Sequence, residues 1–239
     1  LIRWHDPEIG LIMPAQFLHF VQSSAADIAL GEWVIQEALR QTSEWRRAGL
    51  ELVISVNISA YHLAQEDFVS RLRGFLGVYP EMPAHCLEIE ILETAALEDI
   101  THITALMAEC HALGVDFALD DFGTGYSSLT YFKRLPATTL KIDQSFIRDM
   151  LNDDDDLAIV DGIISLSQAF RRTVIAEGVE TNFPVNYRCK ESADLFVILM
   201  TALLKTGGRA AIVLPDGSIT GDGVKQRIRE KLLTDCNVH

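Results

Sequence analysis

Positive charge is scarce in this sequence. It has 20 lysines and arginines against 34 aspartates and glutamates in 239 residues, which gives a formal net charge of −14 at pH 7. Broad nucleic-acid binding is therefore not expected, because attraction to a phosphate backbone needs a surplus of positive charge. Any groove that holds a phosphate ligand must obtain its attraction from a few local cations.

Long apolar runs and paired cysteines are also missing. The longest apolar run, residues 195–204, is about half of the roughly 20 residues that a membrane span needs, so no membrane segment is expected. The four cysteines lie far apart and form no C-x-x-C pair, which argues against a zinc knuckle or a disulfide framework. There is no signal-peptide pattern, and we expect a cytoplasmic protein.

The sequence does contain short apolar or β-branched runs that alternate with longer helical patterns. Strands are predicted at residues 52–56, 86–91, 115–119, 139–142 and 173–176. Helices are predicted at residues 15–22, 28–47, 61–78, 100–113 and 157–170. This order indicates an α/β fold with a parallel sheet, and periodicity alone leaves open a doubly wound sheet or a closed barrel.

Each predicted strand finishes with a metal-capable or charged residue, where the chain leaves the sheet. These residues are Asn57, Glu90, Asp120 with Asp121, Lys141 and Glu177. A barrel would gather all of these strand ends at one mouth, whereas an open sheet would spread them along an edge. The pattern favours a barrel, although strands also end in polar residues simply because loops are wet.

The residue types at these strand ends suit a site for hard divalent cations. Carboxylate and amide oxygens are the ligands that Mg²⁺ and Mn²⁺ prefer, and the histidines show no H-x-x-x-H spacing. Two adjacent carboxylates, Asp120 and Asp121, can hold two ions close together, which favours displacement at phosphorus. Lys141 would then orient water or stabilise phosphate charge, and Glu177 could take a proton.

Six sequence motifs lie in order along residues 1–181. They are Leu-Ile-Arg-Trp at residues 1–4, Ser-Val-Asn-Ile-Ser at 55–59, Leu-Glu-Ile-Glu-Ile-Leu-Glu at 87–93, Asp-Asp-Phe-Gly-Thr-Gly-Tyr-Ser-Ser-Leu at 120–129, Leu-Lys-Ile-Asp at 140–143 and Ala-Glu-Gly-Val-Glu-Thr at 176–181. Together they resemble the motifs of the EAL domains that hydrolyse cyclic di-GMP. Their shared order and spacing are specific to that family. The resemblance covers residues 1–181 and implies a (β/α)8 TIM-like barrel.

The resemblance also implies roles for individual residues. The metal ligands would be Asn57, Glu90, Asp120, Asp121 and Glu177. The catalytic residues would be Lys141, Glu177 and Glu180, and the substrate-binding residues would be Arg3 and Asp143. The loop would be stabilised by Glu93, Gly123, Thr124 and Gly125. The implied reaction is hydrolysis of cyclic di-GMP to the linear dinucleotide with Mg²⁺ or Mn²⁺, and Ca²⁺ would inhibit it. The implied partners are cyclic di-GMP, a second copy in a homodimer, and an upstream sensory or diguanylate-cyclase-like domain.

Two departures from the family pattern keep an alternative open. The glutamate of the Glu-Ala-Leu signature would precede Leu1 and is absent from the 239 residues, and no Gln-Gly-Tyr motif follows Thr181. Leu92 also replaces a common threonine. The missing glutamate and glutamine favour an inactive module that binds cyclic di-GMP or a protein partner, whereas the retained site residues favour an active enzyme by ancestry.

Residues 182–239 resemble a fragment of the DNA adenine methylase subunit of type I restriction systems. They include Leu-Leu-Lys-Thr-Gly-Gly-Arg-Ala-Ala-Ile-Val-Leu-Pro-Asp-Gly at residues 203–217. A methylase function is the weakest reading, because the catalytic motif and the glycine-rich cofactor loop of such enzymes are missing. We expect this segment to replace the last helix, strand and helix of the barrel, with closure of the barrel by it as an open question.

Overall fold

The computed structural model describes residues 2–125, 129–150 and 153–178, together with residues 226–228, 230 and 232. The chain divides into two compact units. The first comprises Leu1–Asp143 and Asp161–Ile175, and the second comprises Gln144–Val160 and Ala176–His239. The predicted methylase-like segment, apart from those few residues, lies outside the described residues, as does Glu180.

The first unit opens with a hairpin and two helices. Strands β1 (Trp4–Asp6) and β2 (Gly10–Ile12) pair antiparallel, and α1 (Pro14–Val21) and α2 (Ala25–Arg47) follow. Helix α2 begins after Ser24, whose hydroxyl accepts a hydrogen bond from the amide of Ala26. This N-cap satisfies a backbone donor that has no partner inside the helix.

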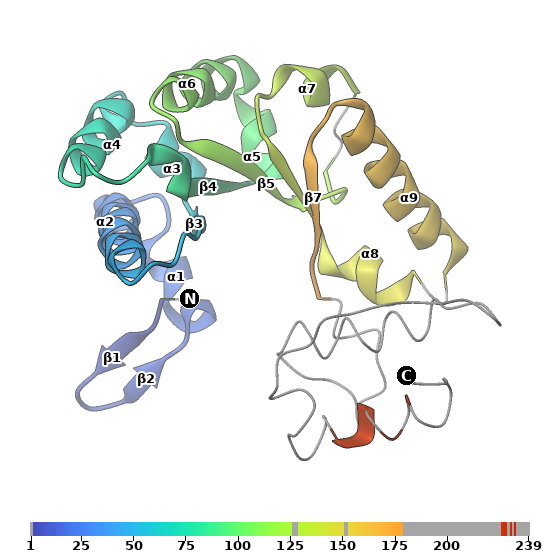
Figure 1. Cartoon of the computed structure of the whole chain (residues 1–239), viewed down its shortest axis with the longest axis horizontal. Coiled ribbons are helices and arrows are strands. Elements are labelled where there is room, and N and C mark those ends of the chain that lie inside the picture. The colour runs from blue at the N-terminus through green and yellow to red at the C-terminus, as the bar shows by residue number, and fades with distance from the viewer. Residues whose placement is uncertain are drawn as a thin grey trace. The chain divides into compact units, whose positions relative to one another are not determined.

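A sheet in the order β3-β4-β5-β6-β7 forms the centre of the first unit (Figure 1). Its strands are β3 (Ile54–Asn57), β4 (Leu87–Leu92), β5 (Asp116–Phe122), β6 (Thr139–Ile142) and β7 (Thr173–Ala176). The ladders β3/β4, β4/β5 and β5/β6 are all parallel. The predicted α/β fold with a parallel sheet is confirmed, and each predicted strand overlaps an observed one.

Helices connect the strands of this sheet along the chain. They are α3 (Ala60–Leu63), α4 (Phe68–Gly77), α5 (Glu93–Glu98), α6 (Ile100–Ala112) and α7 (Leu129–Arg134). A single helix was expected at residues 61–78, but the chain breaks between α3 and α4. The break allows the ring of His62 to pack edge-on against Phe68, with ring centroids 5.1 Å apart.

Alternation along the central strands gives the sheet one apolar and one polar face. In β4, Leu87, Ile89 and Ile91 are at most 1% exposed, while Glu88 and Glu90 point to the opposite side. Strands β5 and β6 continue the pattern with buried Phe117 and Leu140. Each such side chain contributes about 1.5–3 kcal/mol when it leaves water, so this apolar layer holds the first unit together.

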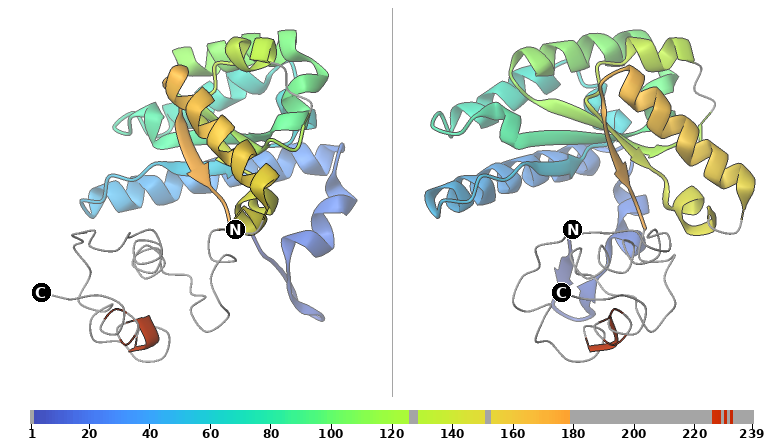
Figure 2. Two further views of the ribbon diagram at one scale, coloured as in Figure 1. Left: turned by 90° about the vertical axis from the view of Figure 1, so that its right-hand side faces the viewer. Right: turned by 45° about the vertical axis from the view of Figure 1, so that its right-hand side comes forward.

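The second unit contains α8 (Gln144–Asp149) and the first part of α9 (Asp154–Ala169). Helix α9 is one continuous helix (Figure 2). Asp153 accepts hydrogen bonds from the amides of Asp155 and Asp156 at the start of α9. Three aspartates also lie in its first turn, where they complement the helix dipole. This acidic run therefore initiates a helix.

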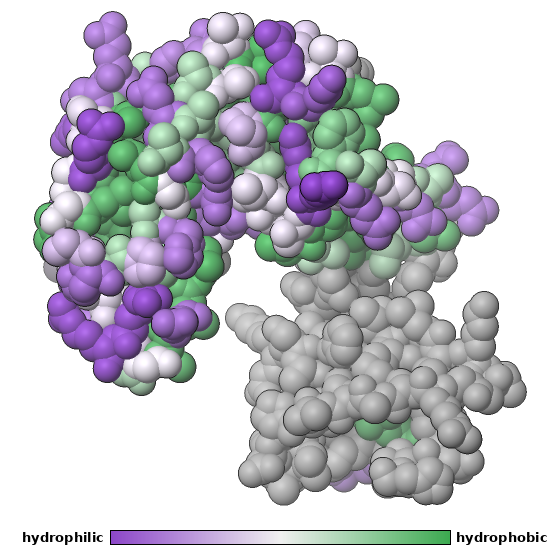
Figure 3. Space-filling model, turned by 45° about the horizontal axis from the view of Figure 1, so that its top comes forward, coloured by the Kyte–Doolittle hydropathy of each residue, from purple (hydrophilic) through white to green (hydrophobic). Residues whose placement is uncertain are grey.

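Closure of a barrel stays a prediction, because the segment expected to complete it lies outside the described residues. Among the described residues, no helix is long and apolar enough to cross a membrane. The surface of these residues mixes hydrophilic and hydrophobic side chains (Figure 3).

Candidate functional site

Strand register brings four polar residues to one end and one face of the sheet. Asn57 pairs with Glu90, and Leu92 pairs with Asp120 across the next ladder. Side chains two residues apart on a strand share a face, so Glu90, Asp120 and Lys141 project from the polar face near the carboxyl ends of their strands. We call Asn57, Glu90, Asp120 and Lys141 the strand-end cluster.

Hydrogen bonds connect all four members of the strand-end cluster. Lys141 Nζ lies 3.0 Å from Glu90 Oε2 and 2.9 Å from Asp120 Oδ1. Asn57 Nδ2 donates to Glu90 Oε2 at 2.7 Å. The side chains of Glu90, Asp120 and Lys141 are 10–13% exposed. Their charges therefore attract each other more strongly than they would in water.

An irregularity in β5 adds a second carboxylate beside the cluster. The sequence predicted that this strand ends at residue 119, but β5 continues to Phe122 and contains both aspartates. In a regular strand Asp120 and Asp121 would face opposite sides, yet the ladder to β6 shifts between Leu119 and Phe122 and Asp121 has a φ of 52°. One carboxylate oxygen of Asp121 consequently lies within 4.8 Å of one of Asp120.

The donor set of this region fits hard divalent cations. Amide and carboxylate oxygens from Asn57, Glu90, Asp120 and Asp121 are the ligand types that Mg²⁺ and Mn²⁺ prefer. The ammonium group of Lys141 already donates hydrogen bonds to two of these carboxylates, those of Glu90 and Asp120. A bound cation would therefore share its ligands with a lysine that offsets their negative charge.

Glu93 holds residues 123–125, which follow β5 and which we call the glycine loop. Glu93 is the first residue of α5, is 1% exposed, and accepts hydrogen bonds at Oε2 from the amides of Gly123 (2.9 Å) and Gly125 (3.1 Å). Gly123 has a φ of 104°, which side-chain-bearing residues rarely adopt. Thr124 Oγ1 donates to the carbonyl of Asp121 at 2.8 Å. Residues 123–125 are thus held in place shortly after the two aspartates.

The structure also describes three other residues that the family resemblance implies. Asp143 follows β6 directly, and its amide donates to the carbonyl of Phe122 at 3.4 Å. Arg3 is exposed, and its guanidinium group donates to the carbonyl of Ile2 at 2.8 Å. Glu177 is the first residue after β7 and belongs to the second unit.

Sequence reasoning missed the residues below the cluster on the same face. Glu88 accepts hydrogen bonds from Ser55 and Thr139, two residues before Asn57 and Lys141 on their strands. The signal was present, because Glu88 and Glu90 alternate with apolar residues in β4. Such a pattern in a strand buried on its other face predicts that both carboxylates share the polar side.

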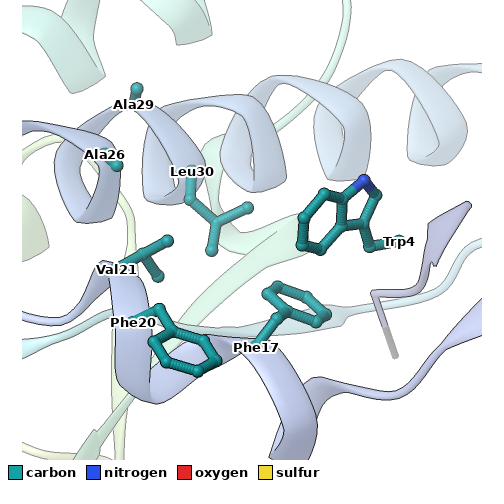
Figure 4. Close-up of a pocket in the computed structure, with 7 residues that line it drawn as sticks. All are labelled: Trp4, Phe17, Phe20, Val21, Ala26, Ala29 and Leu30. Atoms are coloured by element: carbon teal, nitrogen blue, oxygen red, sulfur yellow. The ribbon is translucent and has the colours of Figure 1, made fainter. Parts of the chain in front are cut away.

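The first unit also has an open apolar pocket of about 690 Å³ between its hairpin, α1 and α2 (Figure 4). Trp4, Phe17, Phe20 and Leu30 are among its lining residues, and the rings of Trp4 and Phe17 meet edge-on with centroids 5.9 Å apart. No lining residue is ionisable. Such a pocket has no charged group that could bind a phosphate.

Comparisons with known proteins identify relatives over most of this chain. Over 182 residues the chain is 41% identical to the bifunctional diguanylate cyclase/cyclic di-GMP phosphodiesterase MucR of Pseudomonas aeruginosa, covering 76% of this chain and 26% of that protein. Over 183 residues it is 37% identical to the cyclic di-GMP phosphodiesterase PdeR of Escherichia coli, covering 76% of this chain and 27% of that protein. The chain thus spans about a quarter of the length of these relatives.

Among solved structures, the PaMucR phosphodiesterase in complex with c-di-GMP is similar, with a TM-score of 0.72 and 36% identity. The match covers 84% of this chain and 77% of that one. The EAL domain family matches residues 1–189, more than three quarters of the sequence. This chain belongs to the EAL domain family.

Proposed function

We propose that this chain is a metal-dependent phosphodiesterase that hydrolyses cyclic di-GMP to the linear dinucleotide. The observation that carries the proposal is the strand-end cluster, in which Lys141 lies within 3.0 Å of both Glu90 and Asp120. Relatives named as cyclic di-GMP phosphodiesterases share 37–41% of its residues over the matched segment. Three carboxylates, an amide and one lysine at the carboxyl ends of parallel strands supply what phosphoryl chemistry requires.

The proposed cofactors are Mg²⁺ or Mn²⁺, with Ca²⁺ as an inhibitory ion. Asn57, Glu90, Asp120, Asp121 and Glu177 would hold them. When bound, such cations supply positive charge that offsets charge on the phosphate and lowers the pKa of water.

The chain's own residues would orient and protonate the reacting groups. Lys141, held between two carboxylates, would direct the attacking water and stabilise charge on the phosphate. Glu177 would accept a proton, with Glu180 supporting it, and Arg3 and Asp143 would contact the substrate. Glu93 would keep the glycine loop, with Thr124, in a single conformation over the site.

The architecture of the complete protein is also part of the proposal. Residues 1–181 would form the phosphodiesterase barrel, and residues 182–239, which resemble a methylase fragment, would supply the last helix, strand and helix. A cytoplasmic setting accords with Cys86 and Cys110, which are both buried and free. A homodimer and an upstream sensory or diguanylate-cyclase-like domain are the proposed partners, besides cyclic di-GMP.

Turnover and binding, measured separately, test this function. Linear dinucleotide should form from cyclic di-GMP in Mn²⁺, and equilibrium binding of cyclic di-GMP should persist in Ca²⁺ without turnover. Glu177→Gln should reduce turnover by at least about 100-fold while binding in Ca²⁺ stays within a few-fold, since it removes a proton acceptor and keeps the shape. Binding without any turnover in Mn²⁺ would instead identify a cyclic di-GMP-binding module.

A further inference from the structure

A second polar layer lies beneath the strand-end cluster. Glu88 Oε1 accepts a hydrogen bond from Ser55 Oγ of β3 at 2.8 Å, and Glu88 Oε2 accepts one from Thr139 Oγ1 of β6 at 2.7 Å. Each of these residues lies two positions before a member of the cluster on the same strand. We call Ser55, Glu88 and Thr139 the Glu88 layer.

Burying the carboxylate of Glu88 costs free energy, because the charge leaves water. Glu88 is 9% exposed and Thr139 is 6% exposed. The hydrogen-bond partners of Glu88 in the described part of the chain are neutral hydroxyl groups, which compensate a buried charge less well than a cation does. Asp116, its register partner on β5, interacts instead with His111. An apolar residue of similar size would fill the space at lower cost, so the carboxylate calls for a role beyond packing.

The geometry of the layer suggests that role. Strand β3 is adjacent to β4, but β6 lies two strands away, beyond β5. Ala118 of β5 stands in register with both Glu90 and Thr139, and its small side chain leaves room for a hydrogen bond that crosses β5. The two oxygens of Glu88 therefore connect β3 to β6 across the polar face of the sheet.

We infer that Glu88 is a positioning residue for the metal ligands above it. By holding Ser55 and Thr139, it fixes the spacing of β3, β4 and β6, and with it the spacing of Asn57, Glu90 and Lys141. This inference rests on the proposed function. Metal-binding groups must be held to within about 0.5 Å, and loss of an outer partner typically lowers metal affinity by about 10-fold to 100-fold.

Four substitutions in the full chain, one of them a control, test the inference. Glu88→Leu and Thr139→Val should each weaken Mn²⁺ binding, measured by calorimetry, by about tenfold or more. A urea titration without metal shows whether either variant has lost stability, since Glu88→Leu leaves the hydroxyl groups of Ser55 and Thr139 without their acceptor. Glu88→Gln should keep Mn²⁺ affinity within about threefold, since an amide can donate to one hydroxyl and accept from the other. Thr173→Val, at an exposed position of β7, is the matched control for Thr139→Val and should leave affinity unchanged.

The outcomes separate this inference from the proposed function. Mn²⁺ affinity equal to that of the unaltered chain in both Glu88→Leu and Thr139→Val overturns the positioning role. If Glu88→Leu does not fold, Thr139→Val decides alone. An unaltered chain that binds Mn²⁺ without hydrolysing cyclic di-GMP overturns the proposed activity, while the comparison of affinities still decides the role of Glu88. No Mn²⁺ binding by the unaltered chain overturns both.

Discussion

Lys141 Nζ lies 2.9 Å from Asp120 Oδ1, across the ladder that joins β5 and β6. The same ammonium group reaches Glu90 on β4, so one cation bridges carboxylates from two strands. Both carboxylates are largely shielded from water. Lys141 therefore compensates a pair of negative charges that would otherwise repel each other at the carboxyl end of the sheet.

Replacing this lysine should affect stability and turnover differently. Lys141→Met should lower the free energy of unfolding without metal by about 3 kcal/mol, because two shielded carboxylates lose their cation. Added Mn²⁺ should restore much of this loss, since a divalent cation supplies the missing positive charge. Turnover in saturating Mn²⁺ should still fall at least about 100-fold, which a steady-state assay would measure.

Lys133 offers a matched control for that experiment. It is exposed on α7, so Lys133→Met should change neither the urea midpoint nor turnover. Full turnover in Lys141→Met with Mn²⁺ present would show that the lysine serves only to balance charge.

The glycine loop yields a prediction from its contact with Glu93. A Cβ added at Gly125 would lie 3.0 Å from Glu93 Cδ and 3.2 Å from both carboxylate oxygens. Gly125→Ala should therefore displace the carboxylate that accepts the amides of Gly123 and Gly125, and lower turnover by about tenfold or more, as small misplacements at an active site do. Steady-state kinetics in Mn²⁺ and a urea titration would separate this effect from unfolding.

Gly74 gives the control, because a Cβ there would meet nothing within 4 Å. It lies inside α4, so Gly74→Ala should raise stability by about 0.5–1 kcal/mol and leave turnover unchanged. Equal turnover in Gly125→Ala and the unaltered chain would mean that the glycine loop tolerates a shift of Glu93.

The sheet and the long helices were predictable because their pattern is periodic. Strands β4 and β6 and helices α2 and α6 have predicted and observed bounds that differ by at most three residues. The hairpin β1/β2 was missed because each strand has three residues, too few for alternation to be recognised. Helices α5, α7 and α8 have six residues each and were missed for the same reason.

The members of the strand-end cluster were predictable from the sequence, but the contacts between their side chains were not. Strand ends of a parallel sheet meet at one edge, so Asn57, Glu90 and Lys141 were expected to lie close together. Which atoms meet depends on register between strands far apart in sequence, and the positive φ of Asp121 has no local signal. The Glu88 layer was missed because its partners come from β3 and β6, 33 and 51 residues away.

Arg172 links the start of β7 to the end of α7. Its Nη2 donates to the carbonyls of Phe132 (2.6 Å) and Leu135 (2.7 Å), and its guanidinium carbon lies 4.0 Å from the centre of the Phe132 ring. Arg172→Met should lower the free energy of unfolding by about 2 kcal/mol, because two charge-assisted hydrogen bonds to helix-end carbonyls are lost. Urea unfolding monitored by circular dichroism would measure the change.

The neighbouring arginine should respond in the opposite direction. Arg171 has a φ of 57°, so Arg171→Gly should raise stability by about 1 kcal/mol by removing strain in the left-handed region. A similar loss of stability in both variants would contradict the specific role of Arg172.

His62 provides a pH-dependent contribution to stability. It is 2% exposed, and a Cβ added at Gly31 of α2 would lie only 2.3 Å from its Nδ1. Burial lowers the pKa of His62 below its ordinary value of 6.5, although the carboxylates of Glu32 and Asp27 act in the opposite direction. Asp67 also favours the charged form, whereas Arg71 disfavours it.

The sign of the effect follows from linkage. Because the folded-state pKa of His62 is the lower one, the unfolded chain takes up this proton first as the pH falls, and stability decreases below about pH 6.5. His62→Leu should therefore make the free energy of unfolding, measured in urea at about pH 7.5 and about pH 5, less dependent on pH than in the unaltered chain. His102→Gln changes an exposed histidine and should leave that dependence intact. The same pH dependence in His62→Leu and the unaltered chain would mean that other groups, and not the buried imidazole, cause the loss of stability in acid.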